Sequence, residues 1–188
     1  MDIVFLGTGS MQPSLTRNVS SLALRVAGDV WLFDCGEATQ HQFNRSSVRH
    51  GKVSRIFITH LHGDHLFGLP GLLCTISHAI PAGSPPLVLV GPKGLRRFVR
   101  ASLRLSYSHL GIPIIIHELH DDDMDAPAEA THDPVLEMAD TLLDAPLDCE
   151  VDGMNLLQMS ETFHLFHIST FLYFCDVLPF HIYIVIEQ

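Results

Sequence analysis

The chain has 188 residues, of which 47% are hydrophobic and 17% carry charge. This composition predicts a packed globular fold and excludes an intrinsically disordered chain. The four cysteines are widely spaced and form no paired motif, which argues against a disulfide framework and against a cysteine zinc knuckle. No basic region followed by an apolar stretch opens the sequence, so we expect no signal peptide and a cytoplasmic protein, with the nucleus as the alternative.

The net charge of −10 is divided unevenly along the chain. All eleven Lys and Arg residues fall within residues 1–104 beside five acids, a balance of +6, whereas residues 105–188 hold sixteen acids and no Lys or Arg. A phosphate backbone is attracted to positive surface and repelled by negative surface. We therefore expect the first part of the chain, and not the second, to meet a nucleic acid.

Short apolar runs alternate with turn residues over the first 60 positions, a pattern typical of β-strands. The glycine turn after the first run, Gly7-Thr8-Gly9-Ser10, lacks the third glycine and the helix of a dinucleotide-binding site. Strands are expected at residues 2–6, 20–26, 30–33 and 55–59, and a helix at residues 37–49.

Four potential metal ligands follow the strand at residues 55–59 directly: His60, His62, Asp64 and His65. If the chain stays extended, His60 and His62 point the same way, whereas the adjacent Asp64 and His65 must diverge. This predicts two ions about 3.5–4 Å apart that share a water, with His60 and His62 on one and Asp64 and His65 on the other. The alternative is that one His ends the strand and the others are solvated; we favour the metal, since His is its commonest ligand.

Helix and strand patterns alternate after the cluster, as in α/β folds. A mostly apolar helix is expected at residues 66–80, with its first turn bent or delayed by Gly68, Pro70 and Gly71. Further strands are expected at residues 87–90 and 112–119.

A basic helix between these last two strands carries nearly half of all Lys and Arg residues. They are Lys93, Arg96, Arg97, Arg100 and Arg104. Their spacing places them on one helical face. Two interpretations stay open for this arginine row: a solvated face, or a stripe that contacts nucleic-acid phosphates.

The sequence around the cluster resembles the metallo-β-lactamase superfamily and, within it, ribonuclease Z. The phrases that carry the resemblance are Phe5-Leu6-Gly7-Thr8-Gly9, Thr16-Arg17-Asn18, the run from Trp31 to Glu37, and the run from Ile56 to Leu73. The resemblance is dense to about Leu119, thin to Ser160, and returns around Phe163 to His167. It implies an αββα sandwich, of which residues 1–168 supply the amino-terminal half plus one further strand.

The resemblance also implies the roles of single residues. The zinc ligands that it implies are His60, His62, Asp64, His65 and His167, the last in preference to His164. Asp64 is implied as the general base that orients the attacking water. Asp34 is implied as a brace for a ligating imidazole, in agreement with the usual carboxylate partner of such a ring; the alternative is an Asp that caps the following helix.

By resemblance the activity is zinc-dependent endonucleolytic removal of the 3′ trailer from precursor tRNA, in a homodimer. Arg17 and the arginine row are the candidate RNA contacts. The family's later bridging Asp, last His and tRNA-clamping arm have no matching segment, so we expect an incomplete second zinc site and a poor or inactive nuclease. Two alternatives stay open: a metallo-hydrolase of a small ester, lactone or thioester, and a non-catalytic fragment that binds metal or a partner.

Two segments lie outside the matching phrases. Residues 121–152 hold twelve acids and are expected to form a mobile or loosely helical insertion; a carboxylate metal site is the alternative, without an oxygen-ligand loop pattern. Residues 169–188 form an apolar tail that Asp176, Pro179 and His181 interrupt. We expect a foreign or misjoined carboxy terminus there and no membrane anchor.

Overall fold

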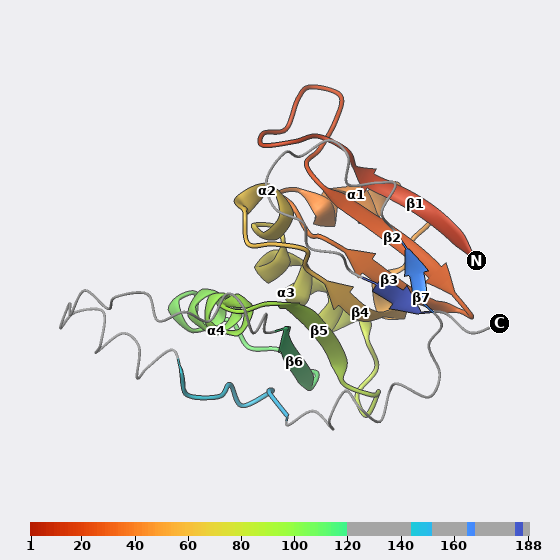
Figure 1. Cartoon of the computed structure of the whole chain (residues 1–188). Helices are drawn as coiled ribbons and strands as arrows, with labels where there is room; N and C mark the ends of the chain where they lie inside the picture. The colour runs from red at the N-terminus through yellow and green to blue at the C-terminus, as the bar shows by residue number, and fades with distance from the viewer. Residues whose placement is uncertain (120–143, 152–164, 168–182, 186–188) are drawn as a thin grey trace. The chain divides into compact units, whose positions relative to one another are not determined.

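Figure 1 shows the computed structural model of the whole chain, which describes residues 1–119, 144–151, 165–167 and 183–185. The chain divides into two compact units, Met1–Val151 and Asp152–Gln188. In the second unit, strands β7 (Leu165–His167) and β8 (Tyr183–Val185) pair antiparallel. The predicted division into a domain of residues 1–168 and a tail of residues 169–188 rests on the family phrases and stays a prediction.

A six-stranded mixed sheet in the order β1 to β6 forms the centre of the first unit. The strands are β1 (Asp2–Gly7), β2 (Ser21–Val26), β3 (Asp29–Phe33), β4 (Val53–Phe57), β5 (Leu87–Pro92) and β6 (Ile114–Leu119). The pairs from β1 to β3 are antiparallel and those from β3 to β6 are parallel. Each of the six predicted strands is present, with ends within two residues of the prediction, so the α/β prediction is confirmed.

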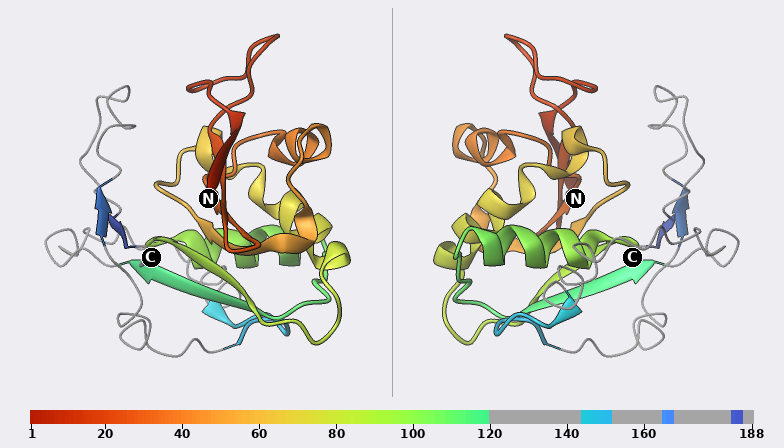
Figure 2. Two further views of the ribbon diagram at one scale, coloured as in Figure 1. Left: turned by 90° about the vertical axis from the view of Figure 1, so that its right-hand side faces the viewer. Right: turned by 90° about the vertical axis from the view of Figure 1, so that its left-hand side faces the viewer.

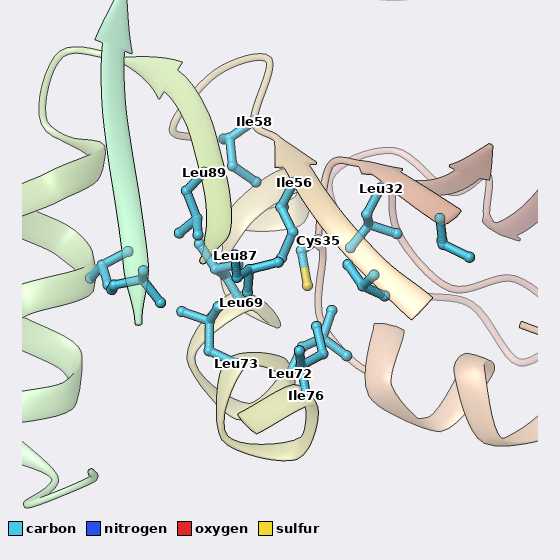
Figure 3. Packing of buried hydrophobic residues seen from close by; sticks show 14 of the residues in the cluster. Leu32, Cys35, Ile56, Ile58, Leu69, Leu72, Leu73, Ile76, Leu87 and Leu89 are labelled. Atoms are coloured by element: carbon cyan, nitrogen blue, oxygen red, sulfur yellow. The ribbon is translucent and has the colours of Figure 1, made fainter. Parts of the chain in front are cut away.

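One face of this sheet packs against helices and forms the core. A row of apolar residues crosses the sheet in register from β2 to β6: Ala23, Leu32, Ile56, Leu89 and Ile116. Leucines of helix α3 (Leu69–Ala79) cover its centre, as Figure 3 shows for Leu69, Leu72 and Leu73. Truncating one such buried leucine to alanine typically costs about 2–5 kcal/mol, so this layer fixes the sheet that carries the strand ends.

The helices begin and end where local backbone chemistry dictates. Helix α1 covers Thr39–Arg45 instead of the predicted residues 37–49, and a 3-10 turn, η1 (His50–Lys52), follows. Ala38 before it is left-handed, with φ of 62°. After it, the Ser46 hydroxyl accepts the Val48 N–H at 3.1 Å, and such a bond competes with helix continuation.

The predicted helix at residues 66–80 corresponds to α3, and a further helix that was not predicted precedes it. This short helix, α2 (Gly63–Leu66), begins inside the cluster, and α3 starts three residues later. Gly68 separates them, and a Cβ on it would overlap the carbonyl oxygen of Gly36. The delay that the glycines and proline predicted is therefore present. Helix α4 (Leu95–Leu105) packs beside α3 (Figure 2), and among the described residues no helix is long and apolar enough to cross a membrane.

The opposite face of the sheet is apolar too. Phe33 and Phe57 stack there with ring centroids 4.9 Å apart, and Arg55 lies over the Trp31 ring at 4.9 Å. Ile3 and Phe5 on the edge strand β1 are half exposed. A sheet that is apolar on both faces is typical of an inner layer, as in a sandwich.

We predict that Gly36→Ala destabilises the first unit by about 1–3 kcal/mol, because the new Cβ would overlap the Asp64 carbonyl oxygen and the Val19 side chain. Urea unfolding measures the change. Gly71→Ala is the matched control, since its Cβ meets only the flexible Gln40 side chain, at 3.3 Å. Equal midpoints for the two variants would show that the Gly36 contact is soft.

Candidate metal centre

The cluster lies at the carboxyl ends of the parallel strands β3 and β4, where open α/β sheets usually bind ligands. Backbone bonds continue the sheet past both ends. The Asp34 N–H donates to the Phe57 carbonyl at 2.8 Å, and the Ile58 N–H donates to the Val90 carbonyl at 2.8 Å. The side chains that follow, from Asp34 and from Thr59 onward, therefore hang from a rigid edge.

Four candidate ligand residues converge here. The ring centroid of His60 lies 4.7 Å from that of His62 and 4.0 Å from that of His65. One ligand atom each of His60, His62 and Asp64 lies within 4.8 Å of the other two. His62 is exposed and the other two are half-buried, so the group opens to solvent on one side.

The directions of the Asp64 and His65 side chains differ from the prediction. Asp64 and His65 were expected to diverge, but Asp64 Oδ2 lies 3.5 Å from His65 Nε2. Helix α2 begins at Gly63, so Asp64 and His65 are helical and about 100° apart around the axis, not on opposite sides as in a strand. Asp64 therefore groups with His60 and His62 as well as with His65.

Asp34 connects the two strand ends through a buried carboxylate, 6% exposed as a residue. It accepts the Thr59 N–H at 2.8 Å, the Thr59 hydroxyl at 2.9 Å and the Ser20 hydroxyl at 3.3 Å, and it lies 2.6 Å from His65 Nδ1. Its φ of 57° is left-handed, a strained conformation typical of functional sites. Helix α1 has Ala38 as its N-cap and no side-chain cap, so Asp34 braces an imidazole and does not cap the helix.

The pKa shifts of His60 and His65 have opposite signs. Burial, together with the neighbouring His65, lowers the pKa of His60, which keeps its ring neutral. Burial also lowers the pKa of His65, but the hydrogen bond and charge of Asp34 outweigh it and the net shift is upward. Burial raises the pKa of the nearby Cys35 thiol far above its ordinary range, so this cysteine stays protonated and is a poor ligand.

The loop between β1 and β2, which projects in Figures 1 and 2, touches the cluster. The Met11 N–H donates to Asp64 Oδ2 at 2.7 Å. The candidate RNA contact Arg17 is exposed on the same loop, in a turn closed by the Ser14 N–H bond to its carbonyl at 2.8 Å. Sequence reasoning missed Met11, because a backbone donor leaves no signal in the residue type.

Comparison with known proteins identifies the family to which the chain belongs. A family model described as "Anti-Pycsar protein Apyc1" matches residues 1–110, more than half of the chain. The chain belongs to this family. Zinc phosphodiesterase ELAC protein 1 of Homo sapiens is 43% identical over 185 residues, which cover 89% of this chain and 50% of that protein. Ribonuclease Z of Limosilactobacillus fermentum is 54% identical over 125 residues, covering 65% of this chain and 40% of that one.

Among solved structures, human tRNase Z, short form, matches with a TM-score of 0.58 at 46% identity. The match covers 65% of this chain and 48% of that one. The resemblance to ribonuclease Z and the metallo-β-lactamase fold are thereby confirmed. This Apyc1-family chain spans half or less of the length of the relatives named here.

Other predicted site residues lie wholly or partly outside the described residues. His167 is in strand β7 of the second unit, and its side chain is outside the described residues. Its role as a ligand stays a prediction. Residues 121–143 and 152 of the acidic insertion and most of the tail at residues 169–188 also lie outside the described part of the chain.

The four arginines of the arginine row lie on α4, whereas Lys93 precedes this helix, contrary to the prediction. Arginines of the row contact acids from residues 144–151 of the same chain. Glu150 receives the Arg100 Nε–H at 2.8 Å and the Arg100 Nη2–H at 2.8 Å, and it also pairs with Arg96. The Glu150 and Arg100 side chains are only 4% and 7% exposed. Burial opposes ionisation of Glu150, but the bonds and charge of Arg100 outweigh it and lower the pKa of the carboxyl. Arg97 Nε lies 3.9 Å from Asp144.

The rest of this segment follows α4 and the sheet edge. Arg104 donates to the carbonyls of Ala145 and of Pro146, the latter at 2.7 Å. The Ile114 N–H of β6 donates to the Cys149 carbonyl at 2.7 Å. Residues 144–151 are therefore packed against α4 and β6.

These contacts correct two predictions. Residues 144–151, the end of the predicted mobile insertion, are anchored by ion pairs and backbone bonds. Arg96 and Arg100 are neither a solvated face nor a phosphate stripe as they stand, because Glu150 occupies them. RNA contacts by Lys93, Arg97 and Arg104 stay predictions.

We predict that Glu150→Ala lowers the free energy of unfolding by about 3–5 kcal/mol, because it leaves Arg100 buried without its carboxylate. Asp144→Ala is the control: Asp144 is exposed and 3.9 Å from Arg97, so its loss should change stability by less than about 1 kcal/mol. Urea unfolding of both variants measures the difference, and comparable losses would contradict the assignment of Glu150 as the anchor.

Proposed function

We propose that the cluster of His60, His62, Asp64 and His65 holds zinc. We further propose that the chain carries this centre of an endoribonuclease that removes the 3′ trailer from precursor tRNA. The observation that supports this most is the convergence of the four side chains beside a carboxylate, Asp34, that orients one of the rings. The names of the relatives, zinc phosphodiesterase, ribonuclease Z and tRNase Z, agree with it.

The donor set fits zinc. Imidazole nitrogen and carboxylate oxygen are ligands that zinc takes readily, and neutral His60 presents a lone pair. We propose His60, His62 and His167 as the three ligands of the better site, and Asp64 and His65 as two ligands of a second ion. With one protein ligand fewer, the second ion should bind more weakly. A homodimer is proposed from the family resemblance alone.

Each residue then has a chemical task. Bound zinc would polarise the scissile phosphate and lower the pKa of water. Asp64 would orient the attacking water and accept its proton, with the Met11 N–H holding one carboxylate oxygen at 2.7 Å. Asp34 holds the His65 ring in place. The loop that carries Arg17 lies beside Asp64, so we propose Arg17 as a phosphate contact near the scissile bond.

The pairing of Glu150 with two arginines favours a second candidate function, hydrolysis of a small ester or thioester. The arginine row argued for RNA over a small ester or thioester, but Glu150 occupies Arg96 and Arg100. The cationic surface that could bind a polyanion is therefore smaller than the sequence predicts. An assay with both kinds of substrate, RNA and a small ester or thioester, decides between the two functions.

We predict that His62→Ala abolishes tight zinc binding at the better site, because two imidazoles are fewer ligands than a catalytic zinc site holds. Elemental analysis after exhaustive dialysis measures the metal content. His41→Ala, an exposed histidine on α1, is the matched control and should retain the zinc of the parent chain. Equal zinc in all three proteins would remove His62 from the site.

The activity is tested by incubating the purified chain with a precursor tRNA and excess zinc, and in parallel with a small ester and a thioester. We predict slow but measurable trailer removal that Asp64→Ala abolishes. Hydrolysis of the ester or thioester with intact precursor tRNA would instead favour the second candidate. Zinc binding with no turnover of any substrate would leave a metal-binding fragment.

A further inference from the structure

Thr59 lies between the buried carboxylate of Asp34 and the ring of His60. Its Oγ1 is 2.9 Å from Asp34 Oδ1, 3.0 Å from Asp34 Oδ2 and 3.0 Å from His60 Nδ1. Its backbone N–H donates separately to Asp34 Oδ1 at 2.8 Å. The hydroxyl therefore joins a carboxylate to an imidazole with which the carboxylate forms no direct hydrogen bond.

The direction of these hydrogen bonds follows from the donor count. An ionised carboxylate only accepts, so the Thr59 hydroxyl must give its single proton to Asp34, with both carboxylate oxygens within 3.0 Å. Bonds to a charged acceptor are roughly twice as strong as neutral ones, so donation to the neutral His60 ring does not compete. The Thr59 oxygen is then an acceptor, and His60 must carry its proton on Nδ1.

The same carboxylate fixes His65 directly. Asp34 Oδ2 lies 2.6 Å from His65 Nδ1, which must therefore donate as well. A neutral imidazole holds one proton, so a proton on Nδ1 leaves the lone pair on Nε2. Both Nε2 atoms are then free to bind a metal.

We propose that Thr59 is a positioning residue that relays Asp34 to His60, so that one buried carboxylate holds the protons of both His60 and His65 on Nδ1 and leaves both Nε2 atoms as ligands. The inference deepens the proposed function and rests on it for the metal. The relay itself is a property of the metal-free chain, and it is measured there without any assay of activity.

The first experiment reads the ring tautomers. Long-range nitrogen–proton NMR of the metal-free chain is recorded at about pH 8, above the ordinary imidazole pKa of about 6.5. In the parent chain, His60 and His65 should both show a proton on Nδ1. A proton on Nε2 of His60 in the parent chain would overturn the inference without any variant.

Two substitutions separate the hydroxyl from the rest of the side chain. Thr59→Val keeps the shape and the backbone N–H bond to Asp34 and removes only the hydroxyl. His60 should then lose its exclusive Nδ1 proton, whereas His65 should not change. Thr59→Ser keeps a hydroxyl and should match the parent, and an unchanged His60 in Thr59→Val would show that another group sets the proton.

Zinc affinity gives the second readout. Loss of such an outer partner typically weakens metal binding about 10–100-fold, so Thr59→Val should fall in this range and Thr59→Ser should stay within about threefold of the parent in competition with a chelator. Equal weakening in both variants, with folding verified by circular dichroism, would reduce Thr59 to a packing residue. Intact relay and zinc binding without cleavage of precursor tRNA would refute the proposed nuclease and leave this inference standing.

Discussion

The satisfaction of one buried charge, the carboxylate of Asp34, organises the candidate centre. An ionised group taken out of water is costly unless it is fully hydrogen-bonded. Asp34 meets this requirement with donors from three places, Ser20 beside β2, Thr59 after β4 and His65 in α2. The strands and the helix that supply those donors are thereby fixed relative to one another. The hydrogen bonds of Asp34 offset the cost of its left-handed φ.

Backbone contacts carry the same constraint outward. The Cys35 N–H donates to the His65 carbonyl at 2.8 Å, and the Gly68 N–H donates to the Cys35 carbonyl at 2.9 Å. This approach leaves no room for a Cβ at Gly36 or at Gly68. The two glycines thus belong to the centre as much as the histidines do, because they let the segment after β3 and the segment around α2 lie close enough for Asp34 to reach His65.

Patterns that are local in sequence predicted most of the fold and the cluster, because strand alternation and the spacing of His60, His62 and His65 need no distant partner. What failed depends on contacts across the chain. The divergence expected of Asp64 and His65 assumed an extended chain, but a helix starts at Gly63. Glu150 is one of twelve acids in residues 121–152, and nothing local marks it as the one that Arg100, fifty residues earlier, will bury.

The pairing of Glu150 with Arg96 and Arg100 also changes how the charge of the chain is weighed. A balance of +6 before residue 105 and −16 after it suggested halves that act separately on a polyanion, yet these residues bring opposite charges into one buried contact. At physiological ionic strength the Debye length is about 8 Å, so exposed acids farther than this from a phosphate are largely screened. The net charge of −10 therefore does not exclude an RNA substrate, and the placement of single cations, such as Arg17 on the loop that contacts Asp64, matters more than the total charge.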